Sequence, residues 1–176
     1  MITFRRAEAS DAPQIAKLHA TSWRNSYRGM LSDRFLDEEV VADRLAVWQK
    51  RLHNPPPSQF VLLAERDQML LGFLGLFAAA HPRWGALLDN LHVRQEAQGQ
   101  GLGKRLMQET VVWIEANYPD AGLYLWVFAS NGQAIRFYEK LGGRLVDEKV
   151  ETEFGEKPVR SLRYVWEPKI DNGRFK

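Results

Sequence analysis

Apolar side chains recur along the chain at two spacings, and each spacing predicts a different kind of element. Spacings of three and four residues are typical of an amphipathic helix, whereas alternating or continuous apolar runs favour a strand. The first pattern predicts helices over residues 10–23, 38–52, 102–118 and 130–141. The second predicts strands over residues 2–6, 60–64, 70–79, 86–93, 123–128, 144–152 and 159–166.

Proline and glycine mark where several of these elements begin and end. Pro13 follows the capping residues Ser10 and Asp11, as is usual in the first turn of a helix. Three consecutive prolines at 55–57 end the second predicted helix, and the glycines at 142–143 end the fourth. Strands and helices in this order predict a mixed α/β sheet with helices on both faces.

Length and composition bound the class of protein. A chain of 176 residues suits one domain, which we expect over residues 1–168, followed by a flexible polar tail at 169–176. The 24 basic and 22 acidic residues nearly balance without a basic block, so a nucleic-acid partner is not indicated. The longest apolar run, residues 69–80, is too short to span a bilayer. The absence of cysteine excludes thiol nucleophiles and fits a reducing compartment, so we expect a cytoplasmic protein without a metal.

The segment Gln98-Gly99-Gln100-Gly101-Leu102-Gly103-Lys104 is the most informative part of the sequence. It joins a predicted strand to a predicted helix, so its backbone N–H groups would gather beside the positive end of the helix dipole. Glycine permits a positive φ and lets a ligand approach the backbone without a Cβ in the way. The turn therefore predicts an anion site, usually for a phosphate, although an ordinary strand-to-helix turn could have the same glycines.

Three segments around this turn together resemble the GNAT N-acetyltransferases. They are Leu91-His92-Val93, the spacing Gln98-x-x-Gly101-x-Gly103, and Asn131-x-x-Ala134-x-x-Phe137-Tyr138-Glu139-Lys140-Leu141-Gly142. Their order, their separation of about 30 residues and their strand–turn–helix setting carry the resemblance. It covers nearly the whole chain and implies a largely antiparallel, twisted sheet of six to seven strands. It also implies direct transfer of an acetyl group from acetyl-CoA to an amine, without an acyl-enzyme.

The resemblance also implies how the chain would hold acetyl-CoA. The turn at 98–104 would bind the pyrophosphate through backbone N–H groups. The backbone of residues 91–93 would pair with the pantetheine arm like an added strand, and one N–H there can polarise the thioester carbonyl. A splay between this strand and the strand at 123–128 would open the slot for the arm. His92 alternates with its neighbours, so its side chain is expected on the opposite face from theirs.

The reaction needs an acid for the thiolate that leaves and a base for the acceptor ammonium. The resemblance implies that Tyr138 is the acid, because a phenol with a pKa of about 10 can donate to a thiolate whose thiol has a pKa of about 8.5. A core aromatic residue beside Phe137 is the alternative for Tyr138. Asn131 would hydrogen-bond the arm. Asp89 and His92 are candidates for the base, and a chain of water molecules is an equal alternative.

The acceptor end carries weaker signals. The branch of the family that acetylates ribosomal-protein N-termini has a glutamate five residues before the motif asparagine, where this chain has Trp126. We therefore expect a primary amine of a small molecule as acceptor, with a protein or peptide acceptor as the alternative. Trp23, Tyr27, Trp126 and Phe128 are candidates for its walls, where cation–π contact could hold an amine. The stripe of the first helix favours a core position for Trp23, and Trp126 and Phe128 could equally be core.

Two further hypotheses use other features of the sequence. A non-catalytic acyl-CoA sensor would keep the glycine-rich turn and lose the chemistry, but the intact Asn131 and Tyr138 argue against it. Trp84, in a predicted hairpin turn at 81–85, could line the rim of the acceptor pocket or form a contact in a homodimer.

Overall fold

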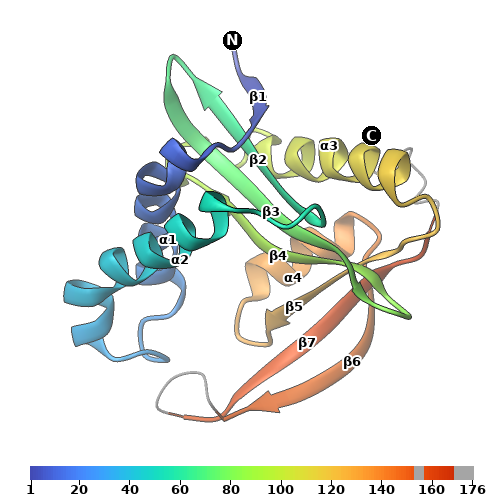
Figure 1. The fold of residues 1–176 in the computed structure, drawn as a ribbon. Coiled ribbons are helices and arrows are strands. Elements are labelled where there is room, and N and C mark those ends of the chain that lie inside the picture. Colours follow the sequence, from blue (N-terminus) through green and yellow to red (C-terminus); the bar gives the residue numbers. More distant parts are fainter. Residues whose placement is uncertain (153–156, 169–176) are drawn as a thin grey trace.

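A seven-stranded mixed sheet forms the centre of the computed structural model, which describes residues 1–152 and 157–168. The strand order is β1-β2-β3-β4-β5-β7-β6, and only β4 and β5 run parallel to each other (Figure 1). This confirms the expected sheet. The strands are β1 (Thr3–Arg6), β2 (Gln59–Arg66), β3 (Met69–His81), β4 (Gly85–Val93), β5 (Leu123–Phe128), β6 (Arg144–Glu151) and β7 (Val159–Trp166).

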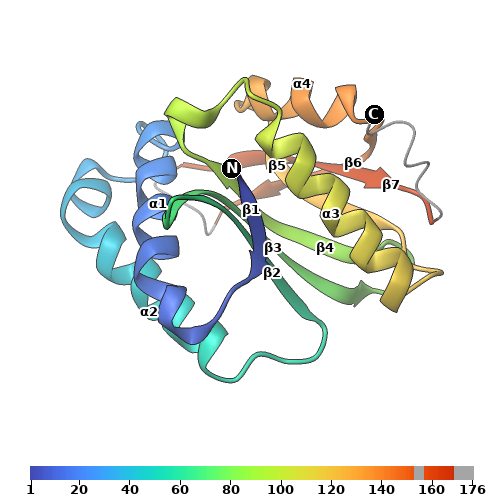
Figure 2. The same cartoon turned by 90° about the horizontal axis from the view of Figure 1, so that it is seen from above.

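Four α-helices cover the two faces of this sheet, as expected from the sequence. Helices α1 and α2 lie on one face and α3 and α4 on the other (Figure 2). They are α1 (Ala12–Ser26), α2 (Val40–His53), α3 (Leu102–Asn117) and α4 (Gly132–Lys140). The second helix differs from its prediction at the start, because a π-helical turn at Phe35–Glu39 precedes it.

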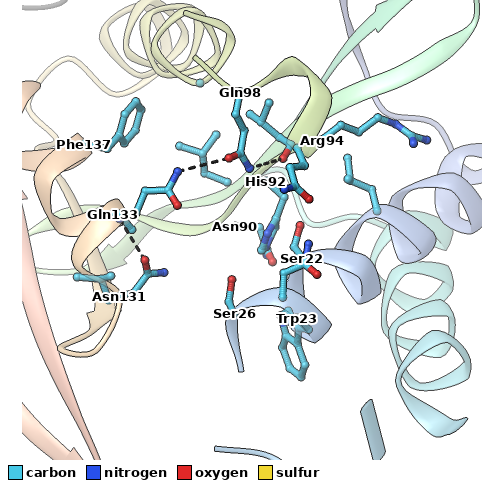
Figure 3. Close-up of a pocket in the computed structure, with 18 of the residues that line it drawn as sticks. Ser22, Trp23, Ser26, Asn90, His92, Arg94, Gln98, Asn131, Gln133 and Phe137 are labelled. Atoms are coloured by element: carbon cyan, nitrogen blue, oxygen red, sulfur yellow. Dashed lines mark hydrogen bonds between the residues drawn. The ribbon is translucent and has the colours of Figure 1, made fainter. Parts of the chain in front are cut away.

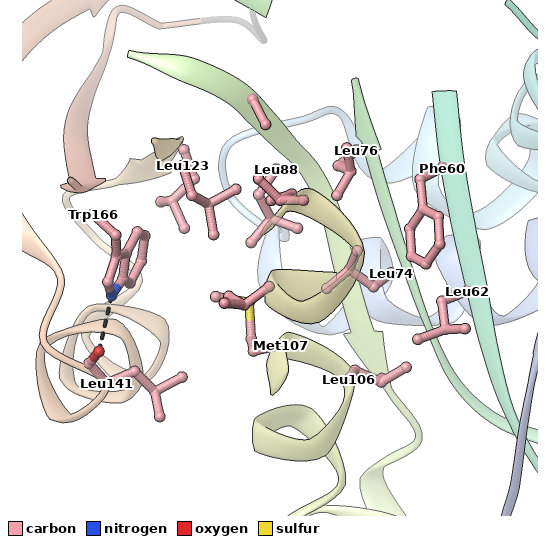
Figure 4. Close-up of a cluster of buried hydrophobic side chains, with 14 of the residues drawn as sticks. Phe60, Leu62, Leu74, Leu76, Leu88, Leu106, Met107, Leu123, Leu141 and Trp166 are labelled. Carbon is pink, nitrogen blue, oxygen red and sulfur yellow. Dashed lines mark hydrogen bonds between the residues drawn. The ribbon is translucent and has the colours of Figure 1, made fainter. Parts of the chain in front are cut away.

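Strands β2 and β3 contribute side chains to both faces of the sheet, which explains their continuous apolar runs. Phe60 packs into the core under α3, whereas its neighbour Val61 packs into the core under α1 and α2. Figure 4 shows the first core, where Leu106 and Met107 of α3 lie over Leu74 of β3. These two cores fix the sheet between its helical layers.

The parallel pair of β4 and β5 is short. Only Ala86 with Leu123 and Leu87 with Tyr124 are in register, and the described residues beyond them do not pair across the two strands. The strands therefore diverge toward their C-terminal ends, as the family resemblance implies.

Three further expectations concern the C-terminal tail, membrane spans and metal binding. The predicted tail, residues 169–176, lies outside the described residues. None of the helices in the described part of the chain is long and apolar enough to cross a membrane. Within the same residues, no group of three His, Cys, Asp or Glu side chains is placed to hold a metal ion.

Candidate active site

A cavity of about 890 Å³ lies where β4 and β5 diverge. Its walls come from α1, the end of β4, the glycine-rich turn, the start of α3, β5 and α4 (Figure 3). The structure brings nearly all of the predicted site residues together here. Those that line the cavity are Trp23, Tyr27, Asp89, Leu91, His92, Val93, Gln98, Gly99, Gly101, Leu102, Gly103, Lys104, Trp126, Phe128, Asn131 and Tyr138. Gln100 and Trp84 are not among the lining residues.

The glycines of the turn have two different structural roles. Gly99 and Gly101 have φ values of 74° and 78°, and a Cβ at either position would meet nothing within 4 Å. Glycine therefore suits the left-handed backbone at both positions, and the space beside each one is open. Gly103 lies within α3, where a Cβ would come 3.3 Å from Cζ of Phe137, so this glycine allows α3 and α4 to pack closely.

The start of α3 fits a phosphate group. Gly101 is the N-cap residue, and no side chain caps the helix there. The first-turn amides have no partner four residues earlier within the helix and stand at the positive end of its dipole. The Gln98 side chain donates to the carbonyl of Val93 at 3.1 Å, and Gln100 donates back to the carbonyl of Glu96 at 2.9 Å. Backbone groups, rather than these amide side chains, thus remain for an anion.

Strand β4 places its side chains through a β-bulge. Leu88 pairs with Leu76 and Asn90 pairs with Gly75, so Asp89 is the extra residue of the bulge. Beyond the bulge, Leu91 and Val93 pack against the core under α3. The His92 ring lies on the opposite face, as its alternation predicts, at 5.2 Å from the Phe73 ring centroid.

His92 has a buried histidine as its neighbour. The ring centroids of His92 and His19 are 4.5 Å apart, and Nε1 of Trp48 donates to Nδ1 of His19 at 3.0 Å. Burial, followed by the positive charge of Arg44, lowers the pKa of His92 to about 4. Burial also lowers the pKa of His19, and the neighbouring His92 adds to this effect. Both rings are therefore neutral at neutral pH, which leaves His92 able to accept a proton but weakly basic.

Asp89, the other candidate base, is already engaged. Its Oδ2 accepts from Nη1 of Arg51 at 2.7 Å and also from the side-chain amide of Asn90. Both donors bind the same oxygen, so Oδ2 of Asp89 is already occupied by groups of the chain itself.

Helix α4 brings Asn131 and Tyr138 to the cavity. Oδ1 of Asn131 accepts from the backbone N–H of Ala134 at 3.1 Å and so caps the helix, which leaves its NH₂ group for a ligand. The Tyr138 ring packs edge-on against Phe137 at 5.3 Å. Burial raises the pKa of Tyr138 above its usual value, and the nearby Tyr27 adds to the shift. Its phenol therefore stays protonated at neutral pH, as a proton donor must.

Aromatic side chains surround the acceptor end. Tyr27 contacts both Trp23 and Phe128 edge-on, each at 5.3 Å between ring centroids, and burial raises the pKa of Tyr27 to about 12. Trp23 is a partly buried wall of the cavity rather than a core residue, and the Arg44 guanidinium lies 4.1 Å from the centroid of its ring. That face of Trp23 is therefore already in contact with a cation.

Trp126 is likewise in contact with cations of the chain itself. The Arg163 guanidinium lies 4.4 Å and the Lys149 ammonium 4.5 Å from its ring centroid. These contacts reduce the ring surface that is left for an acceptor ammonium.

The sequence did not single out several polar residues of this cavity. Ser22, Asn25 and Ser26 of α1 line it, as does the buried Asn90 of β4. The spacing of three and four residues on α1 could have indicated a common face. Nothing local in the sequence marks Asn90 or the buried His19, because the bulge and the packing of α1 on the sheet bring them to the site.

Comparisons with known proteins agree with this fold. The model of the acetyltransferase (GNAT) family matches residues 14–143. A protein of Mycobacterium tuberculosis named as a probable N-acetyltransferase is 29% identical over 142 residues, which are 79% of this chain and 78% of that protein. The spermine/spermidine N(1)-acetyltransferase of Bacillus subtilis is 33% identical over 55 residues, covering 31% of this chain and 36% of that protein.

A solved structure shows the same architecture. The PaiA N-acetyltransferase of Thermoplasma acidophilum, crystallised with coenzyme A, superposes with a TM-score of 0.74 at 19% identity, covering 94% of this chain and 99% of that one. The chain belongs to the GNAT acetyltransferase family. It is an N-acetyltransferase that depends on acetyl-CoA.

Proposed function

We propose that the protein transfers the acetyl group of acetyl-CoA directly to the primary amine of a small molecule. The observation that carries this proposal is the single cavity between β4 and β5. It joins the start of α3, which no side chain caps, a protonated tyrosine and an end lined by aromatic side chains. A donor and an acceptor bound at its two ends would meet beside Tyr138.

The residues at the donor end fit coenzyme A. The first-turn amides of α3 would hold the pyrophosphate, with Lys104 of the same turn as a lining cation. The backbone of residues 91–93 would pair with the pantetheine arm, and the NH₂ group of Asn131 would donate to it. An N–H of the same strand would stabilise the negative charge that develops on the thioester carbonyl oxygen.

Proton transfer is divided between two sides of the cavity. Tyr138 would donate its proton to the sulfur as the C–S bond breaks and the N–C bond forms. The acceptor ammonium would lose its proton through His92 or through water, because a histidine with a pKa near 4 is neutral but weakly basic. Asp89 is the weaker candidate, since Arg51 and Asn90 already occupy its Oδ2.

A small molecule suits the acceptor end better than a peptide does. Tyr27 and Phe128 line this end of the cavity in edge-on contact with each other, and Oγ of the neighbouring Ser130 donates to Sδ of Met30 at 3.7 Å. Trp126 stands where a glutamate would support N-terminal acetylation of ribosomal proteins. A peptide acceptor remains the second candidate. We also propose a cytoplasmic location, which the cysteine-free sequence supports, and keep the homodimer as a prediction.

The substitution Tyr138→Phe tests the proposed acid. We expect CoA release with a panel of primary amines to fall by about 100-fold or more, because general acid catalysis is worth this much. The deficit should narrow above about pH 8.5, where the thiolate can leave without a proton. Binding of acetyl-CoA, measured as a rise in the melting temperature, should persist.

Tyr118→Phe provides a matched control. Tyr118 follows α3 and packs against Trp113 outside the cavity, so loss of its hydroxyl should leave turnover unchanged. Equal turnover in the Tyr138→Phe variant and the wild type would remove Tyr138 from the acid role. Acetyl-CoA binding without CoA release for any amine would favour a sensor, and turnover restricted to peptide N-termini would favour the peptide acceptor.

A further inference from the structure

One face of α1 forms a polar wall of the cavity at its acceptor end. Asn25 and Ser26 follow Ser22 by three and four residues, and all three residues line the cavity. Figure 3 shows Ser22 and Ser26 on this wall, near Asn90 and His92 of β4. Ile15 precedes Ser22 by seven residues, or two helical turns, so it lies on the same side of α1, where it is buried in the core under α1 and α2.

The hydroxyl groups of this wall are not used by the helix itself. Serine and threonine in a helix commonly donate to the carbonyl four residues earlier, and Thr21 does so, to Lys17 at 2.9 Å. Within residues 1–152 and 157–168, no hydrogen bond is assigned to the side chains of Ser22, Asn25 or Ser26. They are therefore available to donate to and accept from a ligand.

A buried amide faces the same space from the sheet. Asn90 is only 6% exposed and lines the cavity. Its Nδ2 donates to the Asp89 carboxylate, which can only accept, and this fixes the orientation of the amide. The carbonyl oxygen of Asn90 receives no hydrogen bond from the described part of the chain. Because Asn90 lines the cavity, a ligand hydroxyl can donate to this oxygen.

Three carboxylates line the cavity: Asp89 and Glu151 are paired, and Glu96 lies in the short turn just before the glycine-rich turn, at the donor end. Asp89 binds Arg51 at 2.7 Å. Oε1 of Glu151 accepts from Oγ of Ser161 at 2.6 Å and lies 3.4 Å from Nζ of Lys149. Among the described residues, the groups left for an acceptor at this end are hydroxyls and amides. A polyamine would need an unpaired carboxylate here to bind its second ammonium.

We propose that Ser22, Asn25, Ser26 and Asn90 form a neutral subsite that recognises hydroxyl groups close to the acceptor amine. The acceptor is then a hydroxylated primary amine, such as an amino sugar or amino alcohol, in preference to a plain alkylamine or a polyamine. This inference rests on the proposed acetyl transfer and specifies its substrate. A hydroxyl group can both donate and accept, which matches serine hydroxyls on one wall and an amide carbonyl on the other.

A pair of amines of similar ring size tests the subsite. Glucosamine has hydroxyl groups around its amine, and cyclohexylamine has none. In the wild type we expect kcat/KM for CoA release to be at least about 10-fold higher with glucosamine, because each neutral hydrogen bond changes binding by about 3- to 10-fold. The double variant Ser22→Ala with Ser26→Ala should lose about 10-fold or more with glucosamine and change less than about 2-fold with cyclohexylamine.

Two controls separate this inference from the proposed function. Ser10→Ala removes an exposed serine before α1 and outside the cavity, and its kinetics with both amines should match those of the wild type. CoA release from cyclohexylamine at least as fast as from glucosamine, or equal losses with both amines in the double variant, would refute the subsite while acetyl transfer stands. Faster turnover of spermidine than of either amine, unchanged in the double variant, would also refute it. No CoA release with any amine would instead count against the proposed function.

Discussion

At the scale of single residues, His19 and His92 show how packing fixes protonation. The indole N–H of Trp48 donates to Nδ1 of His19, so the neutral ring must carry its own proton on Nε2. Arg44 and Arg51 on α2 add positive charge nearby, and Phe73 packs against both rings. Adding a proton to either histidine would place a charge in this buried cluster, beside other positive groups and the second ring.

This cluster predicts that stability depends on pH. The pKa of His92 is about 4 in the folded chain and about 6.5 when unfolded, so the unfolded chain takes up a proton first as the pH falls. The contribution of neutral His92 to the free energy of unfolding is therefore complete above about pH 6.5 and is lost progressively toward pH 4. Between pH 7 and pH 5 we expect His92 to lower the free energy of unfolding by about 2 kcal/mol, measured by urea denaturation.

The variant His92→Gln should lose less free energy of unfolding over the same pH interval, because glutamine does not titrate at position 92. His53 provides the control, since it is exposed at the end of α2. The His53→Gln variant should keep the full wild-type dependence. If His92→Gln loses as much stability as the wild type between pH 7 and pH 5, titration of His92 does not cause the pH dependence of stability.

At the scale of elements, the π-helical turn before α2 depends on an arginine of α1. A π turn widens the helix and frees backbone carbonyls from their regular partners. Arg24 donates from Nε to the carbonyl of Leu36 at 2.7 Å and from Nη2 to that of Asp37 at 3.2 Å. One side chain thus joins α1, which forms a wall of the cavity, to the start of α2.

Arg24→Met should therefore destabilise the fold. We expect a loss of about 1–3 kcal/mol in the free energy of unfolding, because two carbonyls lose a charged donor. Arg34→Met is a suitable comparison in the same region. Arg34 is 79% exposed and pairs only with exposed glutamates, so its loss should cost less than about 0.5 kcal/mol. Similar denaturant midpoints for the two variants would show that Arg24 does not support the π turn.

The sequence predicted most elements because their signals are local. The continuous apolar run of β2, the glycines of the turn and the cap at Asn131 each depend on residues a few positions apart. The π turn before α2 could not be predicted in this way, since its carbonyls are satisfied by Arg24 from another helix. The contacts of Arg44 with Trp23 and of Lys149 with Trp126 are also tertiary, so no local pattern indicates that these rings already contact cations.

At the scale of the whole molecule, the sheet consists of two parts that meet weakly. Strands β1 to β4 and strands β5 to β7 are joined by two residue pairs, and the cavity lies in the gap beyond them. A pantetheine arm that pairs with residues 91–93 would add hydrogen bonds at this gap, while the start of α3 closes on the pyrophosphate. The donor should therefore stabilise the junction of the two parts more than the outer edge of the sheet.

Hydrogen exchange at short labelling times, which reports local opening, tests this expectation. With acetyl-CoA at 100 times its Kd, the folded state gains about 2.7 kcal/mol by mass action. We expect slower exchange at residues 91–93, 98–104 and 131–134, and little change in β1 at the far edge of the sheet. Coenzyme A without the acetyl group should protect the same segments, because the pyrophosphate and the arm make the contacts. Protection confined to 98–104 would mean that the arm does not pair with β4, and that the gap between the two parts of the sheet serves the acceptor alone.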